Sequence, residues 1–407
     1  MDKLQKHFVA GETLLAADLN DVVAKINEGV DEINILAAEN MTDEIYLDFT
    51  KTNPAQVVTG DINGEVIQWI RRNSHRYLAK YTAAGKITIC QLADDDSTLF
   101  AGDGSTAALD GTQGDVMVHI PRFFYRVEEQ AADKWHVQVS LVKINEDWHE
   151  WDGKDLIGAY EAYETGNKTY SRSGVASTGN VSQSTFKSHA RARGTGYSIV
   201  QWHQHCMLAF LFWAEYGNTN CQNIIGSGTN SYEKETGLTD SLGMHDTDVE
   251  HTGNTSSINF WGLENWWGNK AEWVDNVIVN PTSANGVWRI TDLDTNVSRD
   301  VQGFSTPQNE WAYPKSVTLG QHLDMIGKTL GGSTSGSLGD GQYLGRSTSR
   351  AVYRSSDSSN AYGGVVYAVA FSDTSYVLAV IGSRLAFRGE IHIESDVNAF
   401  KAIEVIN

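Results

Sequence analysis

The stretch HDTDVEH, residues 245–251, is the part of the sequence with the strongest metal-ligand character. Imidazole and carboxylate groups are the usual protein ligands of zinc and calcium. In an extended backbone Asp246, Asp248 and Glu250 share one face, with a histidine at each end of the stretch. Charged residues are also ordinary on the surface of an acidic protein. We interpret the stretch as an acidic surface loop and predict no metal site.

Two other stretches carry weaker chemical signals. DLDTN, residues 292–296, begins like a calcium loop but lacks the glycine and the bidentate glutamate at the required offsets. His203 and His205 lie two positions apart on a predicted helix, so they do not face each other. We predict no cofactor and no enzymatic activity. A calcium ion could bind such carboxylates, but no motif in the sequence supports one.

The net charge of the chain bears on its partners. Lys and Arg total 31 against 51 Asp and Glu, which gives a formal charge of −20. A chain this acidic repels nucleic acid phosphates, so we expect no nucleic acid partner. No secretory signal and no apolar run of about 18 residues is visible, so we expect no membrane insertion. Three separated cysteines argue against a disulfide framework.

The composition and the apolar periodicity indicate an α+β protein rich in structured loops. The chain has 38 Gly and only 5 Pro, with 10% aromatic residues. A helix is predicted within residues 197–222, ending near Gly217. A second helical stripe is expected from Val66 to Tyr77. Strands are predicted at 86–93, 115–129, 134–144, 365–371, 376–381 and 385–393.

The order of these patterns suggests three regions. Residues 14–38 have apolar residues at a/d spacing, with asparagines at steps of seven. An ordinary surface helix is the alternative, but we interpret residues 1–40 as an attachment segment and trimeric coil. A glycine-rich stretch at 102–114 then ends a small α+β shoulder domain of residues 41–112. Residues 113–407 form the main domain.

Tryptophans cluster in INFWGLENWWGNKAEWVDN, residues 258–276. The rings could form a binding platform, but a loop-rich fold also needs large rings to supply buried area. We interpret them as core. Sugar stacking by Trp266 or Trp267 is the alternative. Gly268 and Asn269 are expected to form the tight backbone beside the rings.

This stretch resembles the signature of the formylglycine-generating-enzyme-like branch of the C-type lectin fold. LIGAYEAY at 156–163 and GSRLAFRG at 382–389 resemble two further elements of that fold in the same order. The resemblance implies a loop-rich C-type lectin-like domain. Its structural motif is carried by Gly262, Leu263, Trp267, Gly268, Asn269, Glu272, Trp273 and Arg384.

The resembling fold has three known uses. The copper-dependent oxidase needs a pair of cysteines late in the domain, and this chain has none after Cys221. Calcium-dependent sugar binding uses runs such as Glu-Pro-Asn. This run is absent here, and WVDN at 273–276 is only distantly similar to such motifs. The third use is the variable protein of diversity-generating retroelements, typified by the phage major tropism determinant. Residues 343–389 are similar to the variable regions of that group.

The amino-acid content of this segment agrees with the third use. In such systems mutagenesis acts at template adenines, often in AAC codons. Codons of the form NNC cannot encode Lys, Glu, Gln, Met or Trp, and residues 355–381 contain none of these. The resemblance therefore implies a binding face within this segment.

Alternation within VVYAVAF places small residues on one face and large residues on the other. The large face either packs inward as a core strand pair or forms an exposed patch suited to protein binding. We interpret it as an exposed receptor-binding face. Its predicted residues are Tyr353, Tyr362, Tyr367, Val369, Phe371, Ser372, Thr374, Ser375, Tyr376, Leu378 and Val380.

The N-terminal stretch HFVAGETLLAADLNDVVAKIN, residues 7–27, is similar to the start of phage tail-fibre proteins. We therefore expect a homotrimeric receptor-binding protein of the distal tail fibre, located in the virion. Its partners would be a bacterial surface receptor, protein or glycan, and other tail proteins. The alternative is a metal-dependent glycan-binding lectin or adhesin that uses Asp275, Asn276 or residues 245–251.

Overall fold

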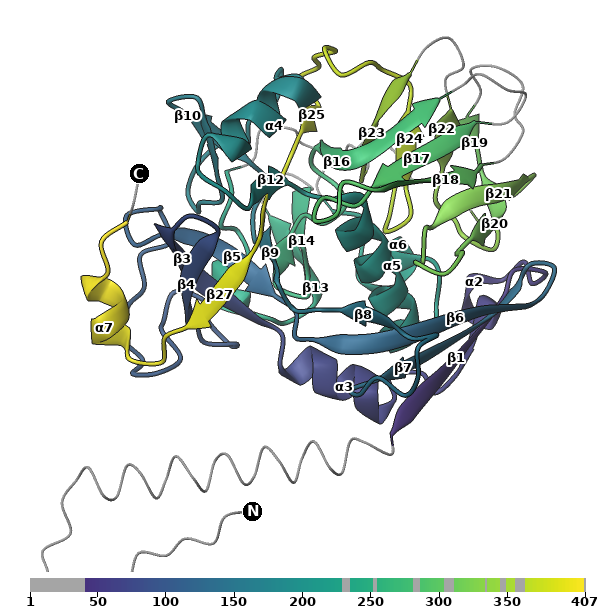
Figure 1. Cartoon of the computed structure of the whole chain (residues 1–407), viewed down its shortest axis with the longest axis horizontal. Helices are drawn as coiled ribbons and strands as arrows, with labels where there is room; N and C mark the ends of the chain where they lie inside the picture. The colour runs from purple at the N-terminus through teal and green to yellow at the C-terminus, as the bar shows by residue number, and fades with distance from the viewer. Residues whose placement is uncertain are drawn as a thin grey trace, which may run out of the picture.

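The computed structural model describes most of the chain after the N-terminal segment, namely residues 41–228, 235–251, 255–280, 286–303, 311–333, 335–344, 349–355 and 363–405. The fold is mixed and strand-rich, with 40% strand and 15% helix, and several sheets surround one central helix (Figure 1). This mixed, strand-rich composition is consistent with the predicted α+β class and with a mostly β loop-rich fold. The predicted coil within residues 1–40 lies outside the described residues.

Among the described residues, helices are few and only one is long. They are α2 (Pro54–Val57), α3 (Glu65–Arg72), α4 (Gln183–Arg191), α5 (Trp202–Tyr216), α6 (Cys221–Ile224) and α7 (Val397–Ala402), with a 3-10 turn at Asp240–Leu242. A reciprocal capping box of Gln201 and Gln204 starts α5. Gly217 ends it in the left-handed conformation, with a φ of 60°. The predicted helix and its end at Gly217 are confirmed.

A five-stranded antiparallel sheet is built from strands within residues 42–151. Its order is β2 (Val58–Gly60), β1 (Thr42–Asp48), β7 (Lys134–Ser140), β6 (Phe123–Ala131) and β8 (His149–Trp151). The β6–β7 hairpin turns at Asp133, whose φ is 61°. This hairpin confirms the predicted pairing of the two alternating stretches, although residues 115–119 join another sheet.

A seven-stranded sheet crosses the boundary predicted at residue 112. Its order is β12 (Tyr197–Ile199), β26 (Leu385–Arg388), β9 (Asp155–Gly158), β5 (Asp115–His119), β3 (His75–Ala83), β4 (Lys86–Gln91) and β27 (Glu390–Ile393). Strand β3 pairs with β4 on one side and β5 on the other. The range 41–112 is therefore not a separate shoulder domain. The helix predicted from Val66 to Tyr77 is shorter than expected: α3 ends at Arg72, and Tyr77 lies in β3.

An eight-stranded sheet carries the segment predicted to bind a receptor. Along it lie β18 (Ser298–Gln302), β17 (Val287–Thr291), β16 (Ala271–Asn280), β23 (Arg350–Arg354), β24 (Ala368–Ala370), β22 (Gln342–Leu344) and β19 (Trp311–Ala312), with β25 (Ile381–Gly382) parallel to β16. The strand predicted at 376–381 was wrong for residues 376–380, which form no strand and follow a turn at residues 374–375. Asp373 caps this turn by accepting hydrogen bonds from the amide and hydroxyl of Ser375.

Three small sheets complete the fold. They are the three-stranded β13 (Thr247–His251), β14 (Thr255–Phe260) and β15 (Leu263–Glu264), the pair β10 (Tyr163–Thr165) and β11 (Lys168–Tyr170), and the pair β20 (Pro314–Thr318) and β21 (Ile326–Leu330). The short strands leave long connections on the surface, which is where binding residues usually lie.

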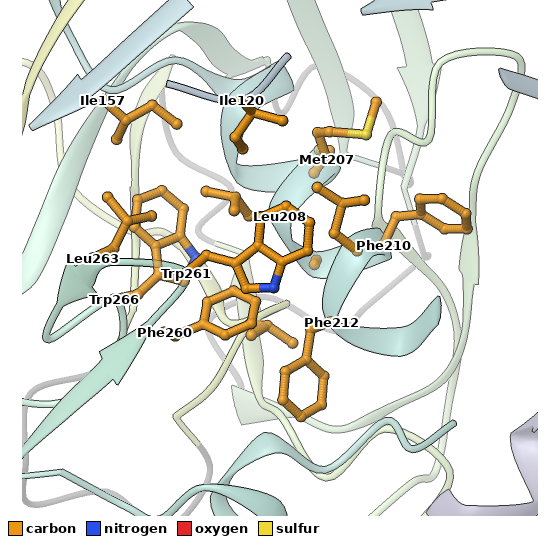
Figure 2. Close-up of a cluster of buried hydrophobic side chains, with 14 of the residues drawn as sticks. Ile120, Ile157, Met207, Leu208, Phe210, Phe212, Phe260, Trp261, Leu263 and Trp266 are labelled. Atoms are coloured by element: carbon orange, nitrogen blue, oxygen red, sulfur yellow. The ribbon is translucent and has the colours of Figure 1, made fainter. Parts of the chain in front are cut away.

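The main core is built around α5 and the tryptophan stretch (Figure 2). Phe212 packs edge-on against Phe260 and Trp267, with ring centroids 5.6 and 6.1 Å apart. Trp261, Trp266, Trp267 and Trp273 are all fully buried. The interpretation of these rings as core is confirmed. A fully buried ring cannot stack on a sugar, so the platform alternative was wrong.

Candidate binding surface

A buried ion cluster joins the two ends of the predicted binding segment. Glu272 on β16 accepts a hydrogen bond from Nη2 of Arg354 at 2.8 Å and from Nε of Arg384 at 2.9 Å. All three side chains are fully buried. The register places Glu272 opposite Arg354 on β23 and beside Gly382 on β25. The chain segments before and after β24 therefore meet at one carboxylate.

Trp266 packs against the same cluster. The guanidinium carbon of Arg354 lies 3.2 Å from the centre of the Trp266 ring. Arg354 also donates to the Trp266 carbonyl, and Arg384 donates to the carbonyls of Gly158 and Glu264. These bonds satisfy backbone groups that loops would otherwise leave unpaired. The cluster thus makes the tryptophan stretch a rigid base for the segment that follows β23.

The predicted structural motif is brought together in this region. Leu263, Trp267 and Trp273 are buried, and Glu272 and Arg384 form an ion pair. Gly268 and Asn269 have φ values of 85° and 48°, which confirms the tight backbone expected there. A Cβ on Gly262 would lie 2.5 Å from the sulfur of Met244. Sequence reasoning missed Arg354, although an arginine inside an apolar strand is a signal of a buried partner.

Part of the predicted receptor-binding face is buried, which corrects the expectation. Tyr367 and Val369 are 3% and 1% exposed, and they pack with Tyr343 and Tyr353 in a small cluster. The small residues on the other face, Val366, Ala368 and Ala370, belong to the main core. Both faces of β24 are therefore covered. Ser372 is also buried, and Tyr362 lies outside the described residues.

The remaining predicted residues form an exposed apolar loop, defined here as residues 371–380. Phe371, Tyr376, Val377 and Leu378 are 44%, 38%, 50% and 41% exposed. They are four of the eleven large apolar side chains exposed in the described chain, and they lie within eight consecutive positions. Thr374 and Ser375 are exposed beside them, and Val380 is partly buried. A concentration of this kind marks an interaction site more often than a scattered residue does.

The backbone of the apolar loop is held by the first turn of α4 and by the segment before it. The amide of Asn180 donates to the carbonyl of Leu378 at 3.0 Å, and the amide of Ser184 donates to the carbonyl of Thr374 at 3.1 Å. Hydrogen bonding to Ser375 lowers the pKa of Asp373. The loop is therefore fixed by backbone bonds and a turn cap, which leaves its apolar side chains free to contact a partner.

Gly179 allows the close approach of this loop, and its replacement is expected to loosen it. A Cβ at position 179 would lie 2.1 Å from the carbonyl oxygen of Ala379, well inside van der Waals contact. We expect Gly179→Ala to speed chymotrypsin cleavage after Phe371 and Tyr376, whereas Ser188→Ala on the exposed side of α4 leaves cleavage unchanged. Limited proteolysis followed by mass spectrometry measures both. Equal cleavage of the two variants would show that the contact does not hold the loop.

The acidic stretch 245–251 is a strand rather than a surface loop. Asp246 is buried at its start, where it accepts hydrogen bonds from Arg71 Nη2 at 2.7 Å and from the Tyr216 hydroxyl at 2.8 Å. Burial raises the pKa of Asp246, and Arg71 opposes this effect. Within the described part of the chain, no three His, Cys, Asp or Glu side chains are grouped to hold a metal.

The residues of the lectin alternative are engaged in other contacts. Asp275 is buried and accepts from Lys187 at 2.6 Å and from Arg191 at 3.0 Å. The Asn276 side chain bonds the Trp202 amide and the Thr291 carbonyl. The cationic side chains of Lys187 and Arg191 thus occupy the Asp275 carboxylate, where a metal ion would have to bind.

A polar cleft of about 170 Å³ lies between β8, α5 and the β17–β18 turn. Arg388 donates to Asp152, Asp155 and Asp294, all of which line it. Asp155 also bonds His203 at 3.3 Å, while His205 is buried in the core, so both histidines have structural surroundings. Arg388 pairs with these three carboxylates and ties the DLDTN turn to β26.

No protein-family model matches the chain, and no curated protein matches it. Among the described residues, no helix is both long and apolar enough to cross a membrane. The anchored apolar loop is therefore the main indication of function in this chain.

Proposed function

We propose that the chain is a phage tail-fibre receptor-binding protein whose C-type lectin-like domain binds a bacterial surface receptor through the apolar loop. The proposal includes a homotrimer formed through residues 1–40, attachment to other tail proteins by the same region, and location in the virion. The observation that carries it is the exposure of four large apolar side chains on a loop fixed at both ends. The sequence resemblances described above supply the viral setting.

The anchoring of the loop favours recognition over a packing role. A segment that tolerates sequence change must fold independently of its own side chains. Here the Glu272 cluster and the backbone bonds to Asn180 and Ser184 provide the positioning. The side chains of Phe371, Tyr376, Val377 and Leu378 can then vary without loss of the core.

The apolar chemistry of the loop suits non-covalent binding. Aromatic and aliphatic side chains at the centre of an interface commonly supply most of its binding energy. Three copies in a trimer would add avidity, so a modest affinity per site suffices for attachment to a cell.

The test is to replace Phe371, Tyr376, Val377 and Leu378 together by serine in the full chain. We expect binding to intact bacteria of a susceptible host to fall at least ~100-fold, because each tenfold loss corresponds to about 1.4 kcal/mol and several side chains contribute. Thermal unfolding and oligomer mass should remain those of the unchanged protein, since these side chains are exposed.

Two controls separate recognition from packing. Ile144→Ser and Val297→Ser remove exposed apolar side chains elsewhere, at 52% and 66% exposure, and should leave binding intact. Tyr367→Ala should instead lower stability, because its ring is buried. Unchanged binding by the quadruple variant would refute the proposed function.

A further inference from the structure

We propose that the receptor is a protein that places an acidic side chain in a basic groove along α4, beside the apolar loop. This inference rests on the proposed function and names the chemistry of its partner. The groove is open to solvent and is lined by Gln183, Ser184, Lys187, Ser188, Arg191 and Thr374.

Helical spacing gathers the groove residues on one face. Positions 184, 187, 188 and 191 are separated by three and four residues, so their side chains lie along one side of α4. Thr374 of the apolar loop completes the lining, and its carbonyl accepts the Ser184 amide. The groove and the apolar side chains therefore form one continuous surface.

The groove keeps a positive charge after its internal pairing. Lys187 and Arg191 both contact Asp275, whose carboxylate is buried and supplies one negative charge against two positive ones. The Arg191 side chain is 54% exposed. Within the described residues Arg191 donates to Asp275 through Nη2. Nε and Nη1 thus keep donors for a carboxylate, which guanidinium groups bind well.

The described residues that line the groove include no acidic side chain. Asp373 on the loop is engaged in its turn with Ser375. Glu164 pairs with His189, which does not belong to the 184–191 spacing of the groove face. A local positive surface on a chain of net charge −20 is an exception, and it favours an anionic group at this place.

The pairing of the two surfaces identifies a protein as the partner. An apolar partner surface would cover the exposed side chains of Phe371, Val377 and Leu378, whereas a carboxylate would pair with the cationic groove. A protein surface commonly offers both within one interface, with an apolar centre and a charged rim. A neutral glycan would offer no charge to Arg191.

The experiment compares two labelled synthetic peptides of equal length, one of alternating Leu and Glu and one of alternating Leu and Lys. Fluorescence anisotropy with the full chain measures their affinities at low and high salt. We expect the acidic peptide to bind at least ~10-fold more tightly at low salt, with the difference shrinking at high salt because the charges are exposed. Equal binding of the peptides, or binding of neither, would overturn the inference.

Charge reversal in the groove provides the matched variants. Ser188→Asp is expected to remove the preference for the acidic peptide, and Ser188→Asn, of similar size and neutral, to keep it. Asn145→Asp adds the same charge on the connection between β7 and β8, two strands that lie far from α4 in Figure 1, and should change nothing. A preference that survives Ser188→Asp would also overturn the inference.

Cell binding distinguishes the failure of the inference from that of the proposed function. If the apolar-loop serine variant loses bacterial binding and Ser188→Asp keeps it, the loop binds the receptor and the groove does not. If neither variant loses binding, both proposals fail. Loss in both variants, with Ser188→Asn unchanged, is the result expected here.

Discussion

Replacement of Glu272 by Gln is expected to lower the free energy of unfolding by about 3–5 kcal/mol, the usual cost of breaking a buried ion pair by removing one partner. The variant keeps the size of the side chain but leaves Arg354 and Arg384 facing a neutral amide, with both guanidinium groups fully buried. Urea denaturation followed by tryptophan fluorescence measures the change. Receptor binding should fall with it, because the cluster joins the chain segments on either side of β24 and the apolar loop.

A surface ion pair offers the matched control. Arg289 donates two hydrogen bonds to Asp300 at 2.8 Å each, in a similar paired geometry but in solvent. Asp300→Asn is expected to leave the urea midpoint unchanged, because solvent and salt screen exposed pairs. Similar midpoints for the Glu272 and Asp300 variants would contradict an anchoring role for the buried cluster.

Asp340→Asn is expected to stabilise the protein at neutral and alkaline pH. Asp340 is buried near the start of β24, where its carboxylate accepts the Val366 amide at 2.8 Å. Burial raises the pKa of Asp340 from its ordinary value of 3.8 to about 8, and the hydrogen bond from Val366 opposes this effect. An asparagine can accept the same bond through its oxygen but cannot ionise.

The direction of the pH effect follows from the proton balance. Between about pH 4 and pH 8 the folded protein holds a proton on Asp340 that the unfolded chain has released. The contribution of this group to stability therefore falls as pH rises, by up to about 1.4 kcal/mol per pH unit, and is constant above pH 8. The variant should lack this slope, so its advantage should grow from pH 4 to pH 8.

Urea midpoints measured across this pH range test the expectation. Asp373→Asn is the control, because the pKa of Asp373 is lowered by its bonds to Ser375 and the group is exposed. That variant should keep the slope due to Asp340. Parallel pH profiles for the Asp340 variant and the unchanged protein would show that Asp340 does not hold its proton in the fold.

Several features of the fold were predictable because local sequence governs them. The continuous apolar content of α5 and the glycine after it define a buried helix and its end. Alternation in residues 123–140 defines the β6–β7 hairpin. The tryptophans around Gly268 were predicted as core because a loop-rich fold must bury large rings, and all are buried. Tyr376 and Leu378 were predicted on the binding face and are exposed, although a strand was predicted where the structure has a loop.

The exposed residues of the binding surface could not all be predicted from local sequence, because the burial of a side chain depends on which distant segments pack against it. Alternation in β24 separates two faces, yet Tyr343 and Tyr353 cover one while the main core covers the other. Phe371, two positions after Val369, lies beyond that cover and is exposed.

Long-range pairing likewise decided the anchors and the sheet. Arg354 and Arg384 meet Glu272 only because β23 and β25 both flank β16, far from it in sequence. The seven-stranded sheet joins residues 75–91 to strands as late as β27, so the glycine-rich stretch at 102–114 is a connection within it. Local sequence thus set the helices, turns and apolar content of this protein. The tertiary structure decided which apolar and charged side chains meet, because that depends on segments distant in the chain.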